Sequence, residues 1–118
     1  MQLPKHAKLL KVADYNRVFD NPVRSSDRYF TVLARPNSLQ NARLGMAFSK
    51  KRVKLAVARN RLKRISRESF RLTQLTEESL NIDYIVLAGG QCAAATNQQL
   101  FHSLEKHWQQ LKIKCEEL

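Results

Sequence analysis

The segment from residue 53 to 72 combines two opposed stripes of side chains, and this pattern restricts the fold more than any other feature of the sequence. At about 100° per residue, a predicted helix gathers the apolar and small side chains on one side. These are Leu55, Ala58, Leu62, Ile65, Ser69 and Leu72. The opposite side carries Asn60, Lys63, Arg64, Arg67 and Arg71, with Arg59 and Arg61 on the flanks. Such a helix must dock on a core by one side and expose its basic side, because burying unpaired charges is costly.

Segments predicted to be strands lie on both sides of this helix. Residues 42–49 alternate large and small side chains, and residues 82–88 are apolar on both faces, as in a buried central strand. A strand, a helix and a strand at this spacing predict a parallel pair joined by a crossover. Residues 28–35 predict another strand, which we expect to pair antiparallel with 42–49 through the turn at 36–38.

Two further helices are predicted, one near each end of the chain. Residues 14–20 have an acidic first residue and are followed by Pro22, and residues 97–114 begin at Asn97, a candidate N-cap. With a further short strand near 22–26, the order is α-β-β-α-β-α. The predicted fold class is therefore α+β, a single domain over residues 1–118 with three helices and a mixed sheet of about four strands.

The charge of the chain is concentrated in one place. Its 118 residues have a formal net charge of +11. Residues 50–71 contain ten Lys or Arg and one acid, whereas the other 96 residues contain eleven Lys or Arg and nine acids. A basic element on an otherwise nearly neutral body indicates a surface for nucleic acid, or less often for an acidic membrane.

The sequence contains no predicted membrane segment and no secretory signal. No run of about 18 apolar residues is present, and the first fifteen residues lack a continuous apolar stretch. We therefore expect a cytoplasmic protein without a membrane partner. Cys92 and Cys115 are isolated in the sequence, which favours reduced thiols over a disulfide or a zinc site.

Residues for catalysis are not evident. A protein nuclease needs metal-binding carboxylates or a general acid and base, but the sequence has no D-x-D, H-x-H or E-x-x-H cluster. His102 and His107 would lie about 140° apart on their helix. We expect His107 to be packed and hydrogen-bonded, and Asp83 to cap or to pair. The residues predict a binding protein with no catalytic residues and no metal ligands of its own.

Two aromatic side chains allow two interpretations. Tyr15 and Phe19 share one face of the first predicted helix, at i and i+4. Paired rings at this spacing are common in cores, but beside a small sheet they could also stack on the bases of a flexible single strand.

The stretch LGMAFSKKRVKLAVARNRLKRISRESFR, residues 44–71, resembles the bacterial ribonuclease P protein family. The family pattern is a strand, then Lys-Lys, then A-x-x-R-N-R-x-K-R-x-x-R-E on a helix, and this chain has every one of these residue types. The segments DYNRVF, RYFTVLAR, IDYIVLA and LEKHW are also similar to family segments. The resemblance extends from about Lys8 to Leu111.

The resemblance implies a fold and a function. The fold would be ribosomal protein S5 domain 2-like, with a left-handed crossover around the basic helix. The protein would join a large catalytic RNA, which hydrolyses precursor tRNA with Mg²⁺ and removes the 5′ leader. Its partners would be that RNA subunit and precursor tRNA, with no role for DNA.

The resemblance also implies residue roles. The residues implied to contact the RNA subunit are Arg59, Asn60, Arg61, Lys63, Arg64, Arg67 and Arg71. Those implied to contact the leader are Tyr15, Phe19, Phe48, Lys50, Lys51, Arg59 and Asn60. The chain departs from the family in the loop 20–28 and at Gly89-Gly90, so the resemblance assigns no role to those positions and leaves their contribution open.

Three other functions remain open from the sequence. A ribosomal or other structural RNA-binding protein would show the same charge pattern without a role in tRNA processing. A DNA-binding regulator is disfavoured because a strand, and not a short helix, precedes the basic helix. A nuclease made of protein alone is disfavoured by the missing carboxylate cluster.

Overall fold

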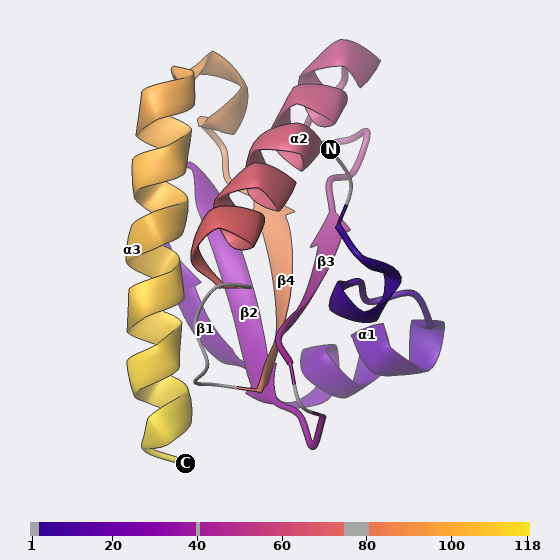
Figure 1. Cartoon of the computed structure of the whole chain (residues 1–118). Helices are drawn as coiled ribbons and strands as arrows, with labels where there is room; N and C mark the ends of the chain where they lie inside the picture. The colour runs from indigo at the N-terminus through magenta and orange to yellow at the C-terminus, as the bar shows by residue number, and fades with distance from the viewer. Residues whose placement is uncertain (1–2, 40, 75–80) are drawn as a thin grey trace.

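The computed structural model describes residues 3–39, 41–74 and 81–118. These residues form three α-helices and one sheet of four strands in the order β1-β2-β4-β3, as can be followed in Figure 1. The helices are α1 (Val12–Asp20), α2 (Ala56–Thr73) and α3 (Asn97–Glu116), with short 3-10 turns η1 (Lys5–Ala7) and η2 (Cys92–Ala94). The strands are β1 (Val23–Ser26), β2 (Phe30–Pro36), β3 (Arg43–Ala47) and β4 (Ile82–Ala88). The predicted mixed sheet, three helices and short extra strand are all confirmed.

One predicted strand pairing is wrong. The strands at 28–35 and 42–49 were expected to be antiparallel neighbours, but β4 lies between β2 and β3. β2 pairs antiparallel with β1 and with β4, and β3 pairs parallel with β4. A hairpin between β2 and β3 would have left β4 without a neighbour on one side. Because β4 is apolar along nearly its whole length, a place inside the sheet buries it better.

The predicted crossover is confirmed. β3 and β4 are parallel and are joined through α2. In Figure 1, α2 lies in front of the sheet, both strands run upward, and β4 lies to the left of β3. This arrangement is a left-handed crossover, as the family resemblance implied, and it is rare among β-α-β units.

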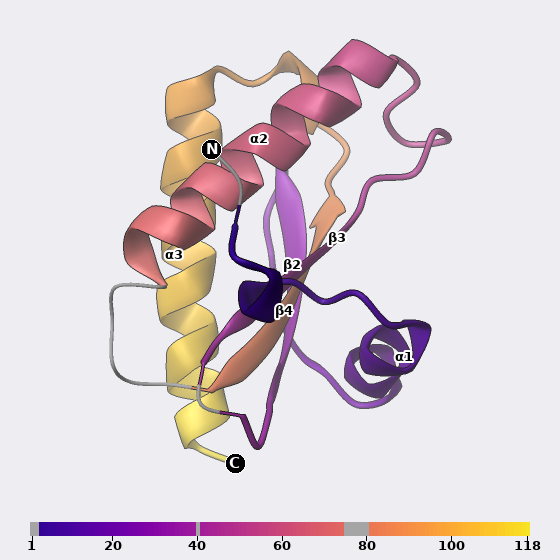
Figure 2. The ribbon, with the colours of Figure 1, turned by 45° about the vertical axis from the view of Figure 1, so that its right-hand side comes forward.

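The sheet separates two cores. Alternate residues of β2 and β4, including Val32 and Tyr84, face α2 and α3 in the main core. The other alternate residues, including Leu33 and Ile85, pack with Val18 of α1 in a smaller core. Figure 2 shows α1 beside the sheet and away from α2 and α3. The two cores therefore give α1 and α2 separate supports.

The N-terminal segment crosses the edge of the sheet at β3. Ala7 is buried in the main core, whereas Leu9 is buried in the smaller one. Between them, Lys8 forms a parallel bridge with Leu44, and the Leu9 amide donates to the Leu44 carbonyl at 3.0 Å. At the opposite edge, the Lys114 ammonium donates to the carbonyl of Arg24 in β1.

The inner side of α2 differs from the predicted stripe at both ends. Leu62, Ile65 and Ser69 are buried as predicted, but Leu55 and Leu72 are 66% and 54% exposed, so their assignment to the core is wrong. Leu55 precedes the first helical residue, and the last buried residue of the helix is Phe70, two positions before Leu72. The core beneath α2 is therefore shorter than the periodicity suggested.

The start of α3 is one residue away from the prediction. Thr96, and not Asn97, is the N-cap: its hydroxyl accepts from the Gln99 amide at 3.1 Å, and the Gln99 side chain accepts from the Thr96 amide at 2.9 Å. This T-x-x-Q capping box satisfies two backbone donors. Within the described ranges, no helix combines the length and apolar character needed to cross a bilayer.

Candidate nucleic-acid interface

The outer side of α2 presents cations that are not neutralised by the protein. Among the described residues, Lys63, Arg64 and Arg67 have no ion pair and no side-chain hydrogen bond. Arg71 donates to Glu68 at 3.0 Å, and Asn60 is exposed beside them. Free guanidinium groups on one helix face can bind phosphate oxygens with two parallel hydrogen bonds.

Two flanking arginines of α2 hold neighbouring loops. Arg59 donates through Nη1 to the carbonyls of Val53 and Lys54, at 2.7 and 2.9 Å. Arg61 donates through Nε to Asn97 Oδ1 at 2.8 Å and through Nη2 to the Ala95 carbonyl at 2.5 Å. These contacts tie α2 to the loops before it and before α3. The sequence pattern of α2 could not predict the contacts of Arg61, because Ala95 and Asn97 lie more than 30 residues further along the chain.

On the other face of the sheet, Tyr15 lies across Gly45. A Cβ at residue 45 would come within 2.9 Å of the Tyr15 ring, so glycine allows the ring to lie on the strand. The Tyr15 hydroxyl accepts from the Met46 amide at 3.3 Å. One turn later, Phe19 is 44% exposed. Tyr15 therefore contributes to the smaller core, whereas Phe19 offers an open ring.

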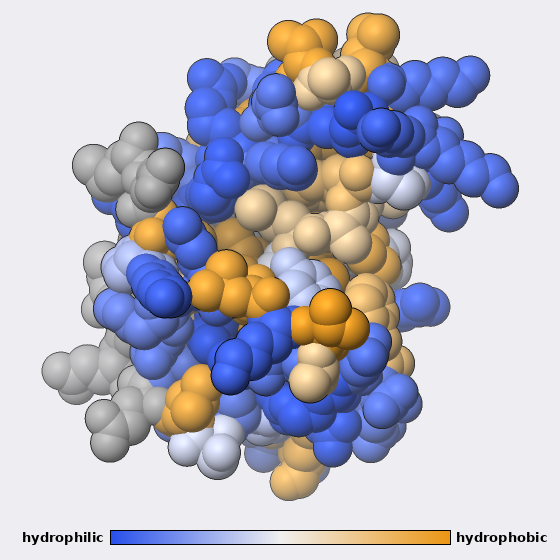
Figure 3. Space-filling view, turned by 90° about the vertical axis from the view of Figure 1, so that its right-hand side faces the viewer, coloured by the Kyte–Doolittle hydropathy of each residue, from blue (hydrophilic) through white to orange (hydrophobic). Residues whose placement is uncertain are grey.

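A groove of about 340 Å³ lies at the end of β4, on the same face of the sheet as α1. It is lined by Arg24, Thr31, Ala47, Ser49, Arg52, Leu87 and Ala88. Figure 3 views the molecule from the side of β3 and shows an apolar area between hydrophilic regions. Thr31, Ala47 and Leu87 are cross-strand neighbours on the same face as α1. The groove combines polar and apolar side chains with two arginines. Such a surface can bind single-stranded nucleic acid, because apolar groups contact the bases and arginines contact the phosphates.

The residues implied to bind the leader are not all brought together. Lys50 and Lys51 are exposed next to groove residues Ser49 and Arg52. Phe48 instead is only 8% exposed and belongs to the main core, with its ring centroid 6.4 Å from that of Phe30. Groove residues such as Arg24, Thr31 and Leu87 were missed, although the alternation of their strands could have pointed to them.

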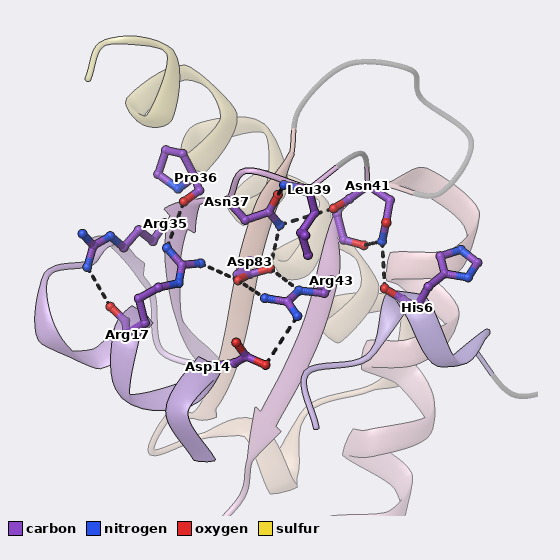
Figure 4. Close-up of polar contacts among 11 residues, drawn as sticks. His6, Asp14, Arg17, Arg35, Pro36, Asn37, Leu39, Asn41, Arg43 and Asp83 are labelled. Carbon is purple, nitrogen blue, oxygen red and sulfur yellow. Dashed lines mark hydrogen bonds and ion pairs between the residues drawn. The ribbon is translucent and has the colours of Figure 1, made fainter. Parts of the chain in front are cut away.

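A buried carboxylate joins α1, β3 and β4 at one end of the sheet (Figure 4). Asp83 is fully buried, and its two oxygens accept from Arg43 at 2.8 and 2.7 Å, from Asn37 at 2.7 Å and from Arg17 at 2.5 Å. Burial alone would raise the pKa of Asp83, but the hydrogen bonds from Arg43, Asn37 and Arg17 hold it below the ordinary value. The expectation that Asp83 pairs is confirmed.

A second carboxylate network lies between β1, β2 and α3. Asp27 accepts from the Ser103 hydroxyl at 2.6 Å and from the backbone amides of Tyr29 and Phe30 at 2.8 and 2.9 Å. Despite burial, these bonds lower the pKa of Asp27. His107 is fully buried, with Nδ1 2.6 Å from the Ser25 hydroxyl, so its predicted packing is confirmed.

The charged groups that the described residues expose differ from those that are buried. Within the described residues, no three His, Cys, Asp or Glu side chains converge as metal ligands. Asp27 and Asp83 are both occupied by internal hydrogen bonds. Apart from Glu68, which pairs with Arg71, the accessible charged groups on α2 and in the lining of the groove are cations, which bind a polyanion.

Comparisons with known proteins agree with this chemistry. The family model for Ribonuclease P matches residues 3–112. The ribonuclease P protein component of Methylococcus capsulatus is 45% identical over 112 residues, which cover 95% of this chain and 86% of the relative. That of Pseudoalteromonas translucida is 37% identical, covering 94% and 78%.

Solved structures give the same result for the fold. The RNase P protein of Staphylococcus aureus superposes with a TM-score of 0.78 at 32% identity, covering 87% of this chain and 93% of that one. The RNase P protein of Thermotoga maritima superposes with a TM-score of 0.72 at 25% identity, covering 82% and 91%. With a family match over most of its length and a shared fold, the chain belongs to the ribonuclease P protein family.

Proposed function

We propose that this protein is the subunit of ribonuclease P that binds the catalytic RNA through the basic side of α2 and the 5′ leader of precursor tRNA through the opposite face of the sheet. The observation that carries the proposal is the set of unpaired cations on α2, Lys63, Arg64 and Arg67, in a chain of this family. A helix that exposes such groups in a row suits the phosphates of a folded RNA. Membership of the family favours this role over that of a ribosomal RNA-binding protein.

The hydrolysis is assigned to the RNA subunit. The described part of the protein offers no converging metal ligands, whereas phosphate and base oxygens of RNA are suited to Mg²⁺. The cations of the protein would offset the repulsion between two polyanions and thereby help the holoenzyme retain Mg²⁺. We propose that the complex of protein and RNA acts in the cytoplasm.

The groove on the α1 face of the sheet would discriminate precursor from product. Phe19 offers a ring for stacking, and Arg24 and Arg52 stand at the margin of the groove for phosphates. A mature tRNA has lost the leader and with it these contacts. The protein would therefore lower the KM for precursor and release product readily.

Reconstitution tests the proposal. Precursor tRNA is incubated at low Mg²⁺ with the RNA subunit, with the protein, and with both, and cleavage products are resolved on gels. We expect cleavage to require the RNA and to rise when the protein is added. Cleavage by the protein alone would contradict the assignment of hydrolysis to the RNA subunit. Tight binding to ribosomal RNA, without stimulation of precursor tRNA cleavage, would favour a structural RNA-binding protein.

The contact with the RNA subunit is tested with Arg64→Ala combined with Arg67→Ala. The loss of two phosphate contacts should reduce the affinity of the protein for the RNA subunit by roughly ten- to a hundredfold. Each tenfold loss corresponds to about 1.4 kcal/mol of binding free energy. The fold should be unchanged, since neither guanidinium has a partner among the described residues. Filter binding and circular dichroism provide the two measurements.

The matched control removes the same charge from a different helix. Lys106→Ala with Lys114→Ala takes two cations from α3, where Lys106 approaches Asp27 at 3.5 Å and Lys114 contacts β1. We expect a much smaller loss of RNA affinity. Equal losses in the two double variants would mean that total charge, and not the face of α2, determines binding.

A further inference from the structure

We propose that Asp83 is a positioning residue for leader recognition: it fixes α1, and with it Tyr15 and Phe19, on the face of the sheet that also carries the groove. This inference rests on the proposed binding of the leader. Asp83 itself cannot touch RNA, because it is fully buried on β4. It would act through the helix that it holds.

Apolar packing alone holds α1 weakly. The helix has nine residues, of which only Val18 is buried, and an isolated helix of this length is marginal in water. The buried residues of its core are Leu9, Val18, Leu33 and Ile85, whereas the main core contains 23 buried residues. The angle and rotation of α1 therefore depend on additional contacts.

Polar contacts tie α1 at both ends to the strands beneath it (Figure 4). Near its C-terminal end, Arg17 donates to Asp83 at 2.5 Å and to the Pro36 carbonyl at 3.1 Å, while Arg35 donates to the Arg17 carbonyl at 2.9 Å. Near its N-terminal end, Asp14 pairs with Arg43 at 3.4 Å.

Asp83 is the common partner in this network. It joins Arg17 of α1 to Arg43 of β3, and Arg43 in turn joins Asp14 of α1. Removing the charge of Asp83 would leave two arginines without their shared anion. Asp14 directly precedes Tyr15, and Arg17 lies two residues from both Tyr15 and Phe19 on a helix of nine residues, so a rotation of α1 moves both rings.

The test compares substrates with Asp83→Asn, which preserves shape and removes the charge. Holoenzyme is assayed on precursor tRNAs with a long leader and with a single-nucleotide leader. For the long leader we expect KM to rise about three- to tenfold, on the scale of one weakened contact, with kcat within about twofold. The single-nucleotide leader should show no change, and the affinity of the protein for the RNA subunit should also stay the same.

Asp27→Asn is the matched control. Asp27 is likewise a hydrogen-bonded carboxylate with a lowered pKa, but its partners lie just before β2, on β2 and on α3. This variant should lose a comparable amount of stability without a change in the ratio of KM between the two substrates. An equal change in that ratio would overturn the inference, because general destabilisation would then explain it.

Substitutions at Arg17 provide a second test if Asp83→Asn does not fold. The Arg17 side chain is 35% exposed, so its replacement should disturb the core less than a change at the buried Asp83. Arg17→Ala should reproduce the leader-specific rise in KM, and Arg17→Lys should restore part of it. Because the two residues share one contact, the double variant should be no worse than the more severe single variant. Additive effects, or equal effects on both leaders, would overturn the inference. Absence of any leader dependence in the wild-type holoenzyme would instead refute the proposed function.

Discussion

His107 shows how one buried polar side chain connects α3 to β1. Its Nδ1 lies 2.6 Å from the Ser25 hydroxyl, and its Nε2 lies 3.2 Å from Asp27. Burial lowers the pKa of His107 from 6.5, although the Asp27 carboxylate opposes this shift. The folded protein therefore favours the neutral imidazole.

The shift predicts a dependence of stability on pH. Because the unfolded histidine takes up a proton at a higher pH than the folded one, the contribution of His107 is complete above about pH 6.5 and is lost as the pH falls toward the folded pKa. The free energy of unfolding should therefore decrease between pH 7.5 and 5.5, with a slope of at most about 1.4 kcal/mol per pH unit. Urea titrations at several pH values measure this slope.

His107→Gln provides the comparison. Its absolute stability will be lower, because a buried hydrogen bond is altered, but its stability should be nearly flat over the same range of pH. A slope equal to that of the wild type would show that another group titrates in this window.

At the residue level, the sequence predicted the positions of charged side chains on the surface better than the contacts between side chains inside the protein. Helical periodicity alone predicts that Arg64, which is exposed, and Arg67, which is partly exposed, lie on the outer side of α2. The partners of Asp83 do not, because Arg17, Asn37 and Arg43 come from 66, 46 and 40 residues earlier in the chain. Likewise, nothing local to Phe48 indicates that its ring turns into the main core.

At the level of elements, the positions of helices and strands were predictable but the strand order was not. Periodicity locates β4 over residues 82–88, with the same bounds as predicted. The neighbours of a strand depend on how the whole sheet buries its apolar residues, and this information is spread over β2, β3 and β4. The register of β2 against β4 pairs Phe30 with Ala88. Neither segment contains a sequence pattern that predicts this pairing.

The N-terminal cap of α3 gives a prediction for one element. Thr96→Ala removes the hydroxyl that accepts from the Gln99 amide and should lower the free energy of unfolding by about 1 kcal/mol. Chemical denaturation measures this change, and Thr96→Ser should retain most of the stability. RNA affinity should be unaffected in both variants, so a parallel loss of affinity would place the start of α3 in the interface.

At the level of the whole molecule, the sheet separates the two surfaces that we propose to bind RNA. The main core supports α2, and the smaller core supports α1. The groove lies on the α1 face, so a substitution there need not alter the basic side of α2. This separation allows the proposed assembly with the RNA subunit and the proposed recognition of the leader to be measured independently.

Salt dependence tests the electrostatic nature of assembly. If the protein neutralises about five phosphates, the logarithm of its affinity for the RNA subunit should fall with the logarithm of salt concentration at a slope of about −4. Arg64→Ala should make the slope shallower by about one unit. A slope near zero would mean that the basic side of α2 does not contact phosphates.

The two edges of the sheet have a practical consequence for the protein before it meets RNA. An open strand edge can recruit the same edge of another molecule and start aggregation. Here the Lys8–Leu44 bridge occupies part of the β3 edge, and Lys114 places a charge on the β1 backbone. Concentrated protein should accordingly resist sheet-to-sheet polymerisation in the absence of RNA.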